Sequence, residues 1–271
     1  MRVSEWIILG YLGYLLALLP VRTVSAWRRL GVAVMAPALA AVVFFGPGVL
    51  PSPVVLLLRD WLPLACVLLG YWMSGFYFVR PQASYEARFL AFDLRARRWF
   101  GAENAATRAP RLLLEFLEVA YFSCYIVLPA GLFALMIAGR ADAANRYWSI
   151  VLLAELGCYG VLPWIRTRPP WALRDTRALD GRGVWMRRLN LMLVHRASTQ
   201  ANTFPSGHAA GALAAALAVC PIWPAAGVAL IVVAFSIMAA SVVGEYHYAG
   251  DALTGALMAV AAWILVAALG V

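Results

Sequence analysis

Lysine is missing from this sequence, and charge of either sign is scarce. All 22 basic residues are arginine, and charged residues make up only 13% of the 271 residues. Soluble proteins carry about twice that share of charge. With 64% hydrophobic residues, so little charge excludes a soluble globular domain and indicates a protein whose solvent is lipid. The all-arginine set reflects either a compositional bias or a use of guanidinium groups to bind phosphate at two oxygens.

Cysteine is also rare. The four cysteines lie singly inside apolar stretches, without metal-ligand or disulfide spacing, and are expected to be small core residues: Cys66, Cys124, Cys158 and Cys220. The net charge of +9 would suggest a nucleic-acid partner in a soluble protein. Here the arginines fall in loops between apolar runs, which favours anionic membrane lipids as partners and no nucleic acid.

Long apolar runs dominate the chain, and a helix needs about 20 such residues to cross a bilayer. Eight candidate runs lie at residues 5–20, 30–50, 61–79, 112–138, 144–164, 206–220, 224–243 and 249–270. They predict an all-α fold, a polytopic transmembrane helical bundle of about eight helices (six to eight), because the first and sixth runs are short. We expect one integral membrane domain over residues 1–271, with a catalytic core at approximately 112–271.

The first run has a second interpretation as a signal peptide. Arg2 precedes it, and Val24-Ser25-Ala26 resembles a cleavage site. Arg22 lies between the apolar stretch and that site, so we interpret the run as an uncleaved helix.

Two loops are long and rich in arginine. In the loop at residues 80–111, the segment around 83–98 interleaves apolar residues with arginines. This pattern predicts an interfacial helix that lies on the membrane surface, or else an ordinary solvated loop helix. The second loop, 165–204, carries eight arginines. Midway along the fifth apolar run, Glu155 is an acid at membrane depth, which makes it a candidate for function.

The chain has only three histidines, and two of them lie where loops meet helices. His208 starts the sixth run, and His247 precedes the eighth. Asp251 follows His247 by four residues, which places both side chains on one face if the helix begins near His247. A carboxylate there can hold one imidazole nitrogen as N–H and leave the other free as a base or nucleophile.

The turn before His208 suits an anion. Gly207 lets the backbone approach a ligand closely, and the first amides of the helix behind it lack helical partners and point toward the ligand. Ser206 adds a hydroxyl donor. Arg166 and Arg168 leave the fifth run at the same membrane face, because odd-numbered loops share one side of an eight-helix arrangement. They can neutralise phosphoryl oxygens, or they can simply end a membrane helix.

These segments resemble the type-2 phosphatidic acid phosphatase superfamily, which also contains vanadium haloperoxidases and sphingolipid headgroup synthases. The second motif of that family is complete here as Pro205-Ser206-Gly207-His208. The third is similar to "SVVGEYHYAGDALTG", in which His247, Asp251 and Gly255 match in spacing. The first is its Arg-Pro segment, here Arg168-Pro169.

The resemblance implies an integral membrane lipid phosphatase that cleaves a phosphomonoester or diphosphate from a lipid. His247 would attack phosphorus and become a phosphohistidine, with Asp251 orienting it, while His208 would protonate the departing oxygen. No metal and no other cofactor are implied. The implied phosphate-binding residues are Arg168, Arg166, Ser206 and Gly207.

The sequence departs from the family at two cations. Val161 and Ser241 stand where a lysine and an arginine are usual. Arg166 and Arg196 are candidates to replace them, and Glu245 is a candidate to tune the charge of His247. The departures resemble the branch near inositol phosphorylceramide synthases.

Alternative functions follow from these departures. One is a lipid headgroup phosphotransferase, and another is a protein that binds or transports a lipid phosphate without catalysis. A third is a metal hydrolase that uses His208, His247, Asp251 and Glu245. The expected location is the cell membrane, as a multi-pass protein. Odd-numbered loops hold 18 of the 22 arginines, which places the site in the cytoplasm by the positive-inside rule, whereas relatives usually carry it on the outer face.

Overall fold

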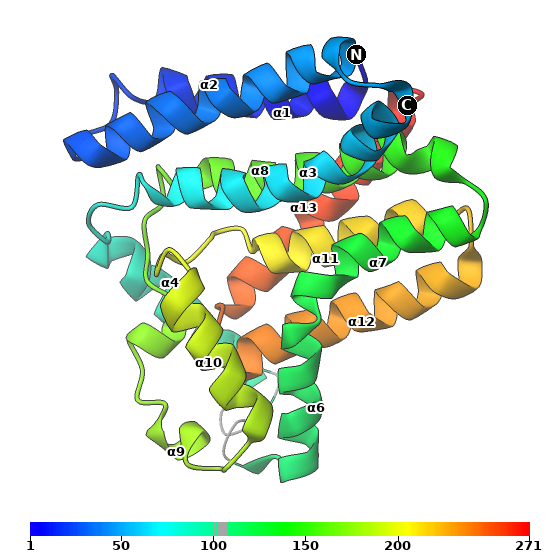
Figure 1. Cartoon of the computed structure of the whole chain (residues 1–271). Helices are drawn as coiled ribbons and strands as arrows, with labels where there is room; N and C mark the ends of the chain where they lie inside the picture. The colour runs from blue at the N-terminus through cyan, green and yellow to red at the C-terminus, as the bar shows by residue number, and fades with distance from the viewer. Residues whose placement is uncertain (100, 102–107) are drawn as a thin grey trace.

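The computed structural model describes residues 1–99, 101 and 108–271, and every element within them is helical (Figure 1). The longer helices are α1 (Val3–Ala17), α2 (Ala26–Val49), α3 (Ser52–Gly75), α4 (Ala83–Trp99), α6 (Arg111–Phe122), α7 (Cys124–Ile137), α8 (Ala144–Val161), α10 (Trp185–Ala197), α11 (Gly207–Val219), α12 (Pro224–Val243) and α13 (Ala249–Ala268). The connections hold the short turns η1 (Ala141–Ala143), η2 (Pro170–Ala172) and α9 (Arg177–Asp180). The predicted all-α fold is confirmed.

Helix α11 lies at the centre of the molecule. It packs against α7, α8, α12 and α13, and nearly all of its residues are buried. Its sequence, GHAAGALAAALAV, is mostly alanine and glycine, and such small side chains let neighbouring helices approach closely. The N-terminal end of this packed helix carries His208, so the surrounding bundle fixes the place of that side chain.

Four helices are long and apolar enough to cross a membrane, namely α2, α3, α12 and α13. A fifth is added if α6 and α7 count as one bent span. The prediction of about eight such helices was therefore too high for the described part of the chain. Helices α1 and α11, with 15 and 13 residues, are shorter than the roughly 20 residues that a span needs.

Helix α8 was expected to span the membrane but is not apolar enough by composition. It contacts α1, α3, α11 and α13, and most of its residues are buried, including Trp148 and Glu155. A helix enclosed by other helices faces little lipid, so its sequence does not need an apolar surface all round. Counting apolar runs does not separate such a core helix from one that faces lipid.

The single run predicted at 112–138 is broken in the structure. Helices α6 and α7 meet at an angle of 60° at Ser123. In Figure 1, α6 stands across the direction of α7 and lies beside α10, with which it packs. The break brings residues on both sides of Ser123 toward the N-terminal end of α11.

The segment predicted as an interfacial helix forms α4, which packs against α13. Its inward face is charged, because Glu86, Asp93 and Arg97 are buried while Phe92 and Leu94 are about half exposed. The exposed side of α4 carries Phe92 and Leu94 together with Arg88 and Arg95, and such a mixture of apolar and basic side chains is compatible with a helix at the membrane surface.

Candidate active site

The turn before α11 is fixed by the backbone of α13. The Ser206 N–H donates to the Asp251 carbonyl oxygen at 2.9 Å. The Ser206 hydroxyl caps α11 by accepting from the Ala209 N–H at 3.3 Å, and Ser206 is fully buried. Serine is a favoured residue at a helix N-cap for this reason. The hydroxyl predicted to bind phosphate is thus engaged within the helix cap, and its contacts join α11 to α13.

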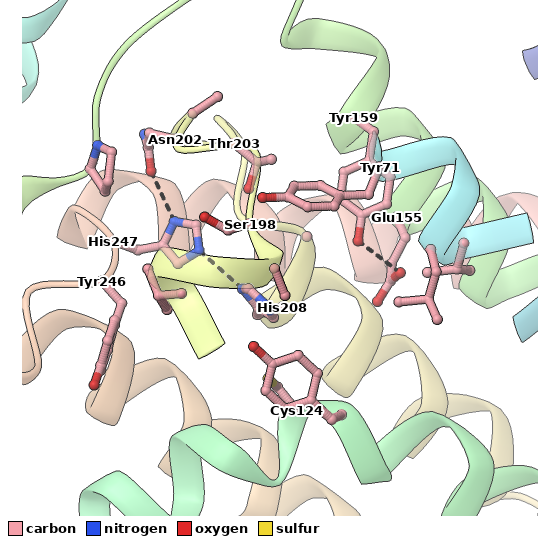
Figure 2. Close-up of a pocket in the computed structure, with 18 of the residues that line it drawn as sticks. Tyr71, Cys124, Glu155, Tyr159, Ser198, Asn202, Thr203, His208, Tyr246 and His247 are labelled. Carbon is pink, nitrogen blue, oxygen red and sulfur yellow. Dashed lines mark hydrogen bonds between the residues drawn. The ribbon is translucent and has the colours of Figure 1, made fainter. Parts of the chain in front are cut away.

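The two catalytic histidines predicted from the sequence lie in direct contact (Figure 2). His208 Nδ1 and His247 Nε2 are 3.1 Å apart, and His247 Nδ1 lies 3.1 Å from the Asn202 side-chain oxygen. Because an amide oxygen only accepts, His247 carries its proton on Nδ1. His247 Nε2 then has the lone pair, and His208 Nδ1 is the donor to it.

Asp251 lies beside this pair. One of its carboxylate oxygens, Oδ2, is 3.5 Å from His247 Nδ1 and accepts from the Tyr248 N–H at 3.0 Å. Helix α13 begins at Ala249, so His247 precedes the helix instead of lying in its first turn. The expected contact still forms, because Asp251 reaches back from the first helical turn as a capping side chain. Its other oxygen, Oδ1, is buried and has no hydrogen-bond partner among the residues that the structure describes.

Asn202 is a site residue that the sequence analysis missed. It is buried, its N–H donates to the Thr167 carbonyl oxygen at 2.8 Å, and its side-chain NH₂ group donates to the Thr167 hydroxyl at 3.3 Å. These bonds tie the segment before α11 to the segment that follows α8. The available signal was its place just before the Pro-Ser-Gly-His turn, but no spacing rule assigns a role to an asparagine there.

A cavity of about 310 Å³ opens beside the histidines. Figure 2 shows His208 and His247 at one part of its wall and the pair Glu155–Tyr159 at another. Its volume falls at the low end of the range for small-molecule sites, about 300 to 1,000 Å³. The lining is largely apolar and aromatic and includes Leu64, Val67, Tyr71, Tyr121, Tyr125, Leu128, Trp171 and Tyr246.

Gly207 is the predicted phosphate-binding residue that does line this cavity. A Cβ at this position would overlap the ring of Tyr159. The glycine therefore lets Tyr159 of α8 approach the N-terminus of α11, where backbone N–H groups without helical partners point out of the helix. Tyr159 in turn donates its hydroxyl to Glu155 at 3.1 Å.

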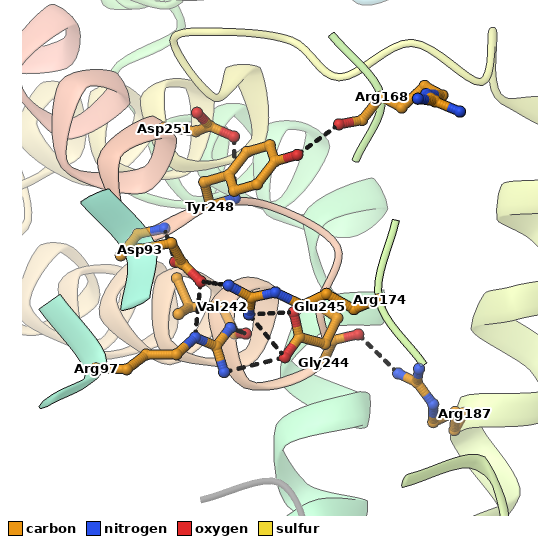
Figure 3. Close-up of polar contacts among 11 residues, drawn as sticks. Asp93, Arg97, Arg168, Arg174, Arg187, Val242, Gly244, Glu245, Tyr248 and Asp251 are labelled. Carbon is orange, nitrogen blue, oxygen red and sulfur yellow. Dashed lines mark hydrogen bonds and ion pairs between the residues drawn. The ribbon is translucent and has the colours of Figure 1, made fainter. Parts of the chain in front are cut away.

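The predicted arginine ligands lie outside the cavity lining. Arg168 pairs with Glu86 through two hydrogen bonds of 2.9 Å, with 43% of its side chain exposed. This hydrogen bonding holds the pKa of Glu86 below its ordinary value, against the opposing effect of burial. Figure 3 shows the Arg168 guanidinium directed away from Asp251. Arg166 has a buried Nε with no hydrogen-bond partner in the described part of the chain, and Arg196 is exposed on α10.

Glu245 stands two residues before His247, but its side chain points elsewhere. It forms ion pairs with Arg97 at 3.0 Å and with Arg174 at 2.9 Å. Burial raises the pKa of Glu245, while the two arginines oppose that rise. The structure therefore brings together His208, His247, Asp251 and Gly207, and it places Glu245 in a separate buried charge cluster (Figure 3).

Comparison with known proteins gives one result beyond this geometry. A family model described as the PAP2 superfamily matches residues 90–265. Searches of curated proteins and of solved structures find no match. The matched range covers more than half of the chain and contains the Pro-Ser-Gly-His turn, the contacting histidines and Asp251. The chain belongs to the PAP2 superfamily, the family of type-2 phosphatidic acid phosphatases that its motifs resemble.

Proposed function

We propose that the protein is an integral membrane lipid phosphatase that works through a phosphohistidine at His247. The observation that carries this proposal is the hydrogen-bond chain from Asn202 through His247 to His208. It leaves one nitrogen of His247 as a lone-pair donor that faces a second imidazole. Two such groups on either side of a phosphorus atom supply a nucleophile and a general acid without a metal.

The first chemical step follows from these positions. A phosphoryl group enters between the imidazoles, His247 Nε2 bonds to phosphorus, and the bond from phosphorus to the lipid oxygen breaks. The negative charge of the phosphate stabilises the protonated form of His208, which gives its Nδ1 proton to the departing oxygen. Asn202 and Asp251 keep the proton on His247 Nδ1, and the carboxylate stabilises the positive charge on the phosphorylated ring.

The second step returns the protein to its starting state. His208, now neutral, takes a proton from a water molecule as that water bonds to phosphorus. The N–P bond breaks, inorganic phosphate leaves, and His247 regains its lone pair. One histidine thus serves as acid in the first step and as base in the second.

Phosphate binding rests on the N-terminus of α11. The amides of Gly207 and His208 and the positive end of the helix dipole form a site for an anion. Arg168 joins them only if its guanidinium exchanges Glu86 for the substrate, since that pair is formed in this structure. In this proposal Arg166 and Arg196 have no direct contact with phosphorus, and Ser206 acts by capping the helix.

The apolar cavity beside the histidines fits the chain or the glycerol end of a lipid. Helix α3, which lines the cavity, and helix α12, which packs against α11, are both long and apolar enough to span a bilayer. We therefore propose a multi-pass protein of the cell membrane that acts on a lipid phosphate or diphosphate, with the site near the membrane surface.

A second candidate is phosphotransfer to an alcohol in place of water. The observation that favours it is the Glu155–Tyr159 pair inside the same cavity as the histidines. Glu155 is 5% exposed and has no cationic partner among the described residues. A carboxyl oxygen in that position can accept a hydrogen bond from the hydroxyl group of a second substrate.

The test is turnover by pure protein in detergent with a chelator present. Phosphatidate, phosphatidylglycerophosphate, polyprenyl diphosphate, and a phospholipid donor with an alcohol acceptor are offered separately. Release of inorganic phosphate supports the phosphatase, and formation of a new phosphodiester supports the transferase. A ³²P-labelled substrate should leave acid-labile label on the protein, as a phosphohistidine does.

Histidine variants supply the matched control. His247→Ala is expected to abolish turnover and labelling, whereas His195→Ala, at an exposed position on α10, should keep both. Undiminished turnover by His247→Ala would reject the proposed mechanism. Binding of lipid phosphate without turnover by the unaltered protein would support a non-catalytic binding role instead.

A further inference from the structure

The loop that carries His247 is held at both ends by α4, a helix outside the motifs that mark the family. The Ala249 N–H donates to Asp93 Oδ1 at 2.8 Å, and Arg97 Nη2 donates to the Val242 carbonyl oxygen at 2.8 Å. These two bonds bracket the segment between α12 and α13. His247 therefore sits in a loop whose entry and exit are both bonded to the same neighbouring helix.

Four charged side chains, three of them buried and the fourth, Arg174, 19% exposed, form a closed ring that links α4 to this loop (Figure 3). Arg97 pairs with Asp93 at 2.8 Å and with Glu245 at 3.0 Å. Arg174 pairs with the same two carboxylates at 2.6 and 2.9 Å. The members of this four-charge ring are Asp93, Arg97, Arg174 and Glu245. Their formal charges cancel, and each buried charge depends on the others for compensation.

The ring also acts on backbone geometry, which apolar packing at the same place would not do. Glu245 has a φ of +63°, a left-handed conformation that non-glycine residues adopt rarely. Its side chain is bonded to Arg97 and Arg174, and its carbonyl oxygen accepts from the Trp171 N–H at 2.9 Å. The conformation of the turn two residues before His247 is thus determined by bonds from two separate segments, α4 and the stretch from Trp171 to Arg174.

A further arginine completes the hold on the loop. Arg187 of α10 is buried, and its Nη1 donates to the Gly244 carbonyl oxygen at 2.9 Å. Within the loop, the His247 N–H donates to the Ser241 carbonyl oxygen at 3.0 Å. Few degrees of freedom remain for the His247 ring, whose two nitrogens must meet Asn202 and His208 at the same time.

We propose that the four-charge ring positions His247 for phosphoryl transfer, so that α4 is part of the active-site framework and its ring members act as positioning residues. The role in turnover rests on the proposed function, whereas the restraint on the His247 ring does not. An imidazole displaced by about 1 Å loses its approach to phosphorus, and displacements of that size cost about 100-fold in rate.

Arg97→Gln tests the proposal, and Arg95→Gln is the matched control. Arg95 lies on the same helix, is exposed, and makes no ion pair or hydrogen bond among the described residues. Arg97→Lys is the conservative variant. It keeps the charge but lacks the fork that reaches Asp93, Glu245 and the Val242 oxygen together. Asp93→Asn also breaks the four-charge ring and replaces Arg97→Gln as the test variant if that one does not fold.

The first readout is ¹⁵N NMR of the histidine side chains, which is practical because the chain has only three. In the unaltered protein and in Arg95→Gln, the His247 signals should report an Nδ1–H tautomer bonded to His208. In Arg97→Gln and Asp93→Asn, this bond should be lost or averaged while the His195 signals stay in place. This readout needs no substrate, so it decides the restraint even if the proposed function is wrong.

The second readout is the kinetic split on the best substrate of the panel above. Arg97→Gln should lower kcat by about 10- to 100-fold with KM changed by less than about twofold. Arg97→Lys should fall between it and the unaltered protein. Unchanged His247 signals in both ring variants would overturn the proposal, and so would altered signals with an unchanged kcat.

Discussion

A close approach of α11 and α13 at Gly255 offers the sharpest test of the site, through the substitution Gly255→Ala. A Cβ at this position would meet the Ser206 carbonyl oxygen well inside 3.0 Å, with Ala209 Cβ at 3.1 Å and the Ala210 nitrogen at 3.3 Å. The atoms in the way belong mainly to the backbone and to a methyl group. They have no rotamer by which to move aside, so the helices themselves must separate.

The size of the effect can be worked from this overlap. Ordinary contact begins near 3.4 Å, which requires α13 to move by about 1 Å relative to α11. Such overpacking typically costs about 1–3 kcal/mol of stability. The same movement carries Asp251 and the loop before it away from His208. We therefore expect kcat to fall by about 100-fold, with the His208–His247 hydrogen bond weakened.

The assay combines thermal unfolding in detergent, turnover of the best substrate, and the histidine ¹⁵N spectrum. Gly13→Ala on α1 is the control, since nothing lies within 4 Å of a Cβ there. An alanine in that helix interior should raise stability by about 0.5–1 kcal/mol. If Gly255→Ala matched the unaltered protein in unfolding temperature and in turnover, the contact between α11 and α13 described here would be refuted.

Three further predictions concern single side chains. His208→Ala should slow hydrolysis of a lipid phosphate by about 10²- to 10⁴-fold. Hydrolysis of a substrate whose leaving group is acidic, such as p-nitrophenyl phosphate, should slow far less, because that leaving group needs no proton. Equal losses on both substrates would reject the general-acid role. Arg187→Ala leaves Glu118 buried without its cation and should lower the unfolding free energy by about 3–5 kcal/mol. The double variant that adds Glu118→Gln should recover part of this loss. A double variant that recovers none of it would contradict the assignment of the loss to the unpaired carboxylate. Because Arg168 holds the pKa of Glu86 low, the stability from their pair is present above the unfolded pKa of about 4.3 and is lost as pH falls through the lowered folded value. Glu86→Gln should remove this dependence of the unfolding temperature on acid pH. The pair contributes less than about 1 kcal/mol to the unfolding free energy, because Arg168 is partly exposed. An unfolding profile at acid pH identical to that of the unaltered protein would contradict the pairing.

The grouping of residues at the N-terminal end of α11 was predictable from sequence because it depends on short spacings. Pro205 to His208 forms a single turn, and His247 and Asp251 are four residues apart at the N-terminal end of α13. A few neighbouring residues therefore define each part of the site. Their meeting also required that two loops share one membrane face, which alternating helices supply. Here the structure brings together what the sequence indicated, with His208 and His247 in contact.

The partners of the arginines were not predictable in the same way. Arg168 is paired with Glu86, which lies 82 residues earlier in the chain, and a pairing over that distance leaves no local pattern. Asn202 gains its role only because α11 and the segment at Thr167 lie side by side. The same holds for α8, whose position among other helices decides how apolar it must be.

Direct contact between the two imidazoles has a consequence for which molecules react. In the proposed mechanism His247 Nε2 is the reacting nitrogen, and it already accepts a hydrogen bond from His208, so an incoming phosphoester would first have to replace that bond. A small water-soluble metabolite offers little affinity beyond its phosphate with which to drive that exchange. A lipid substrate, as proposed, would also place carbon chain in the neighbouring cavity of about 310 Å³, and affinity from such remote groups can drive the rearrangement at the reacting centre. Discrimination against soluble phosphoesters then arises from the resting arrangement itself, without any side chain dedicated to rejecting them.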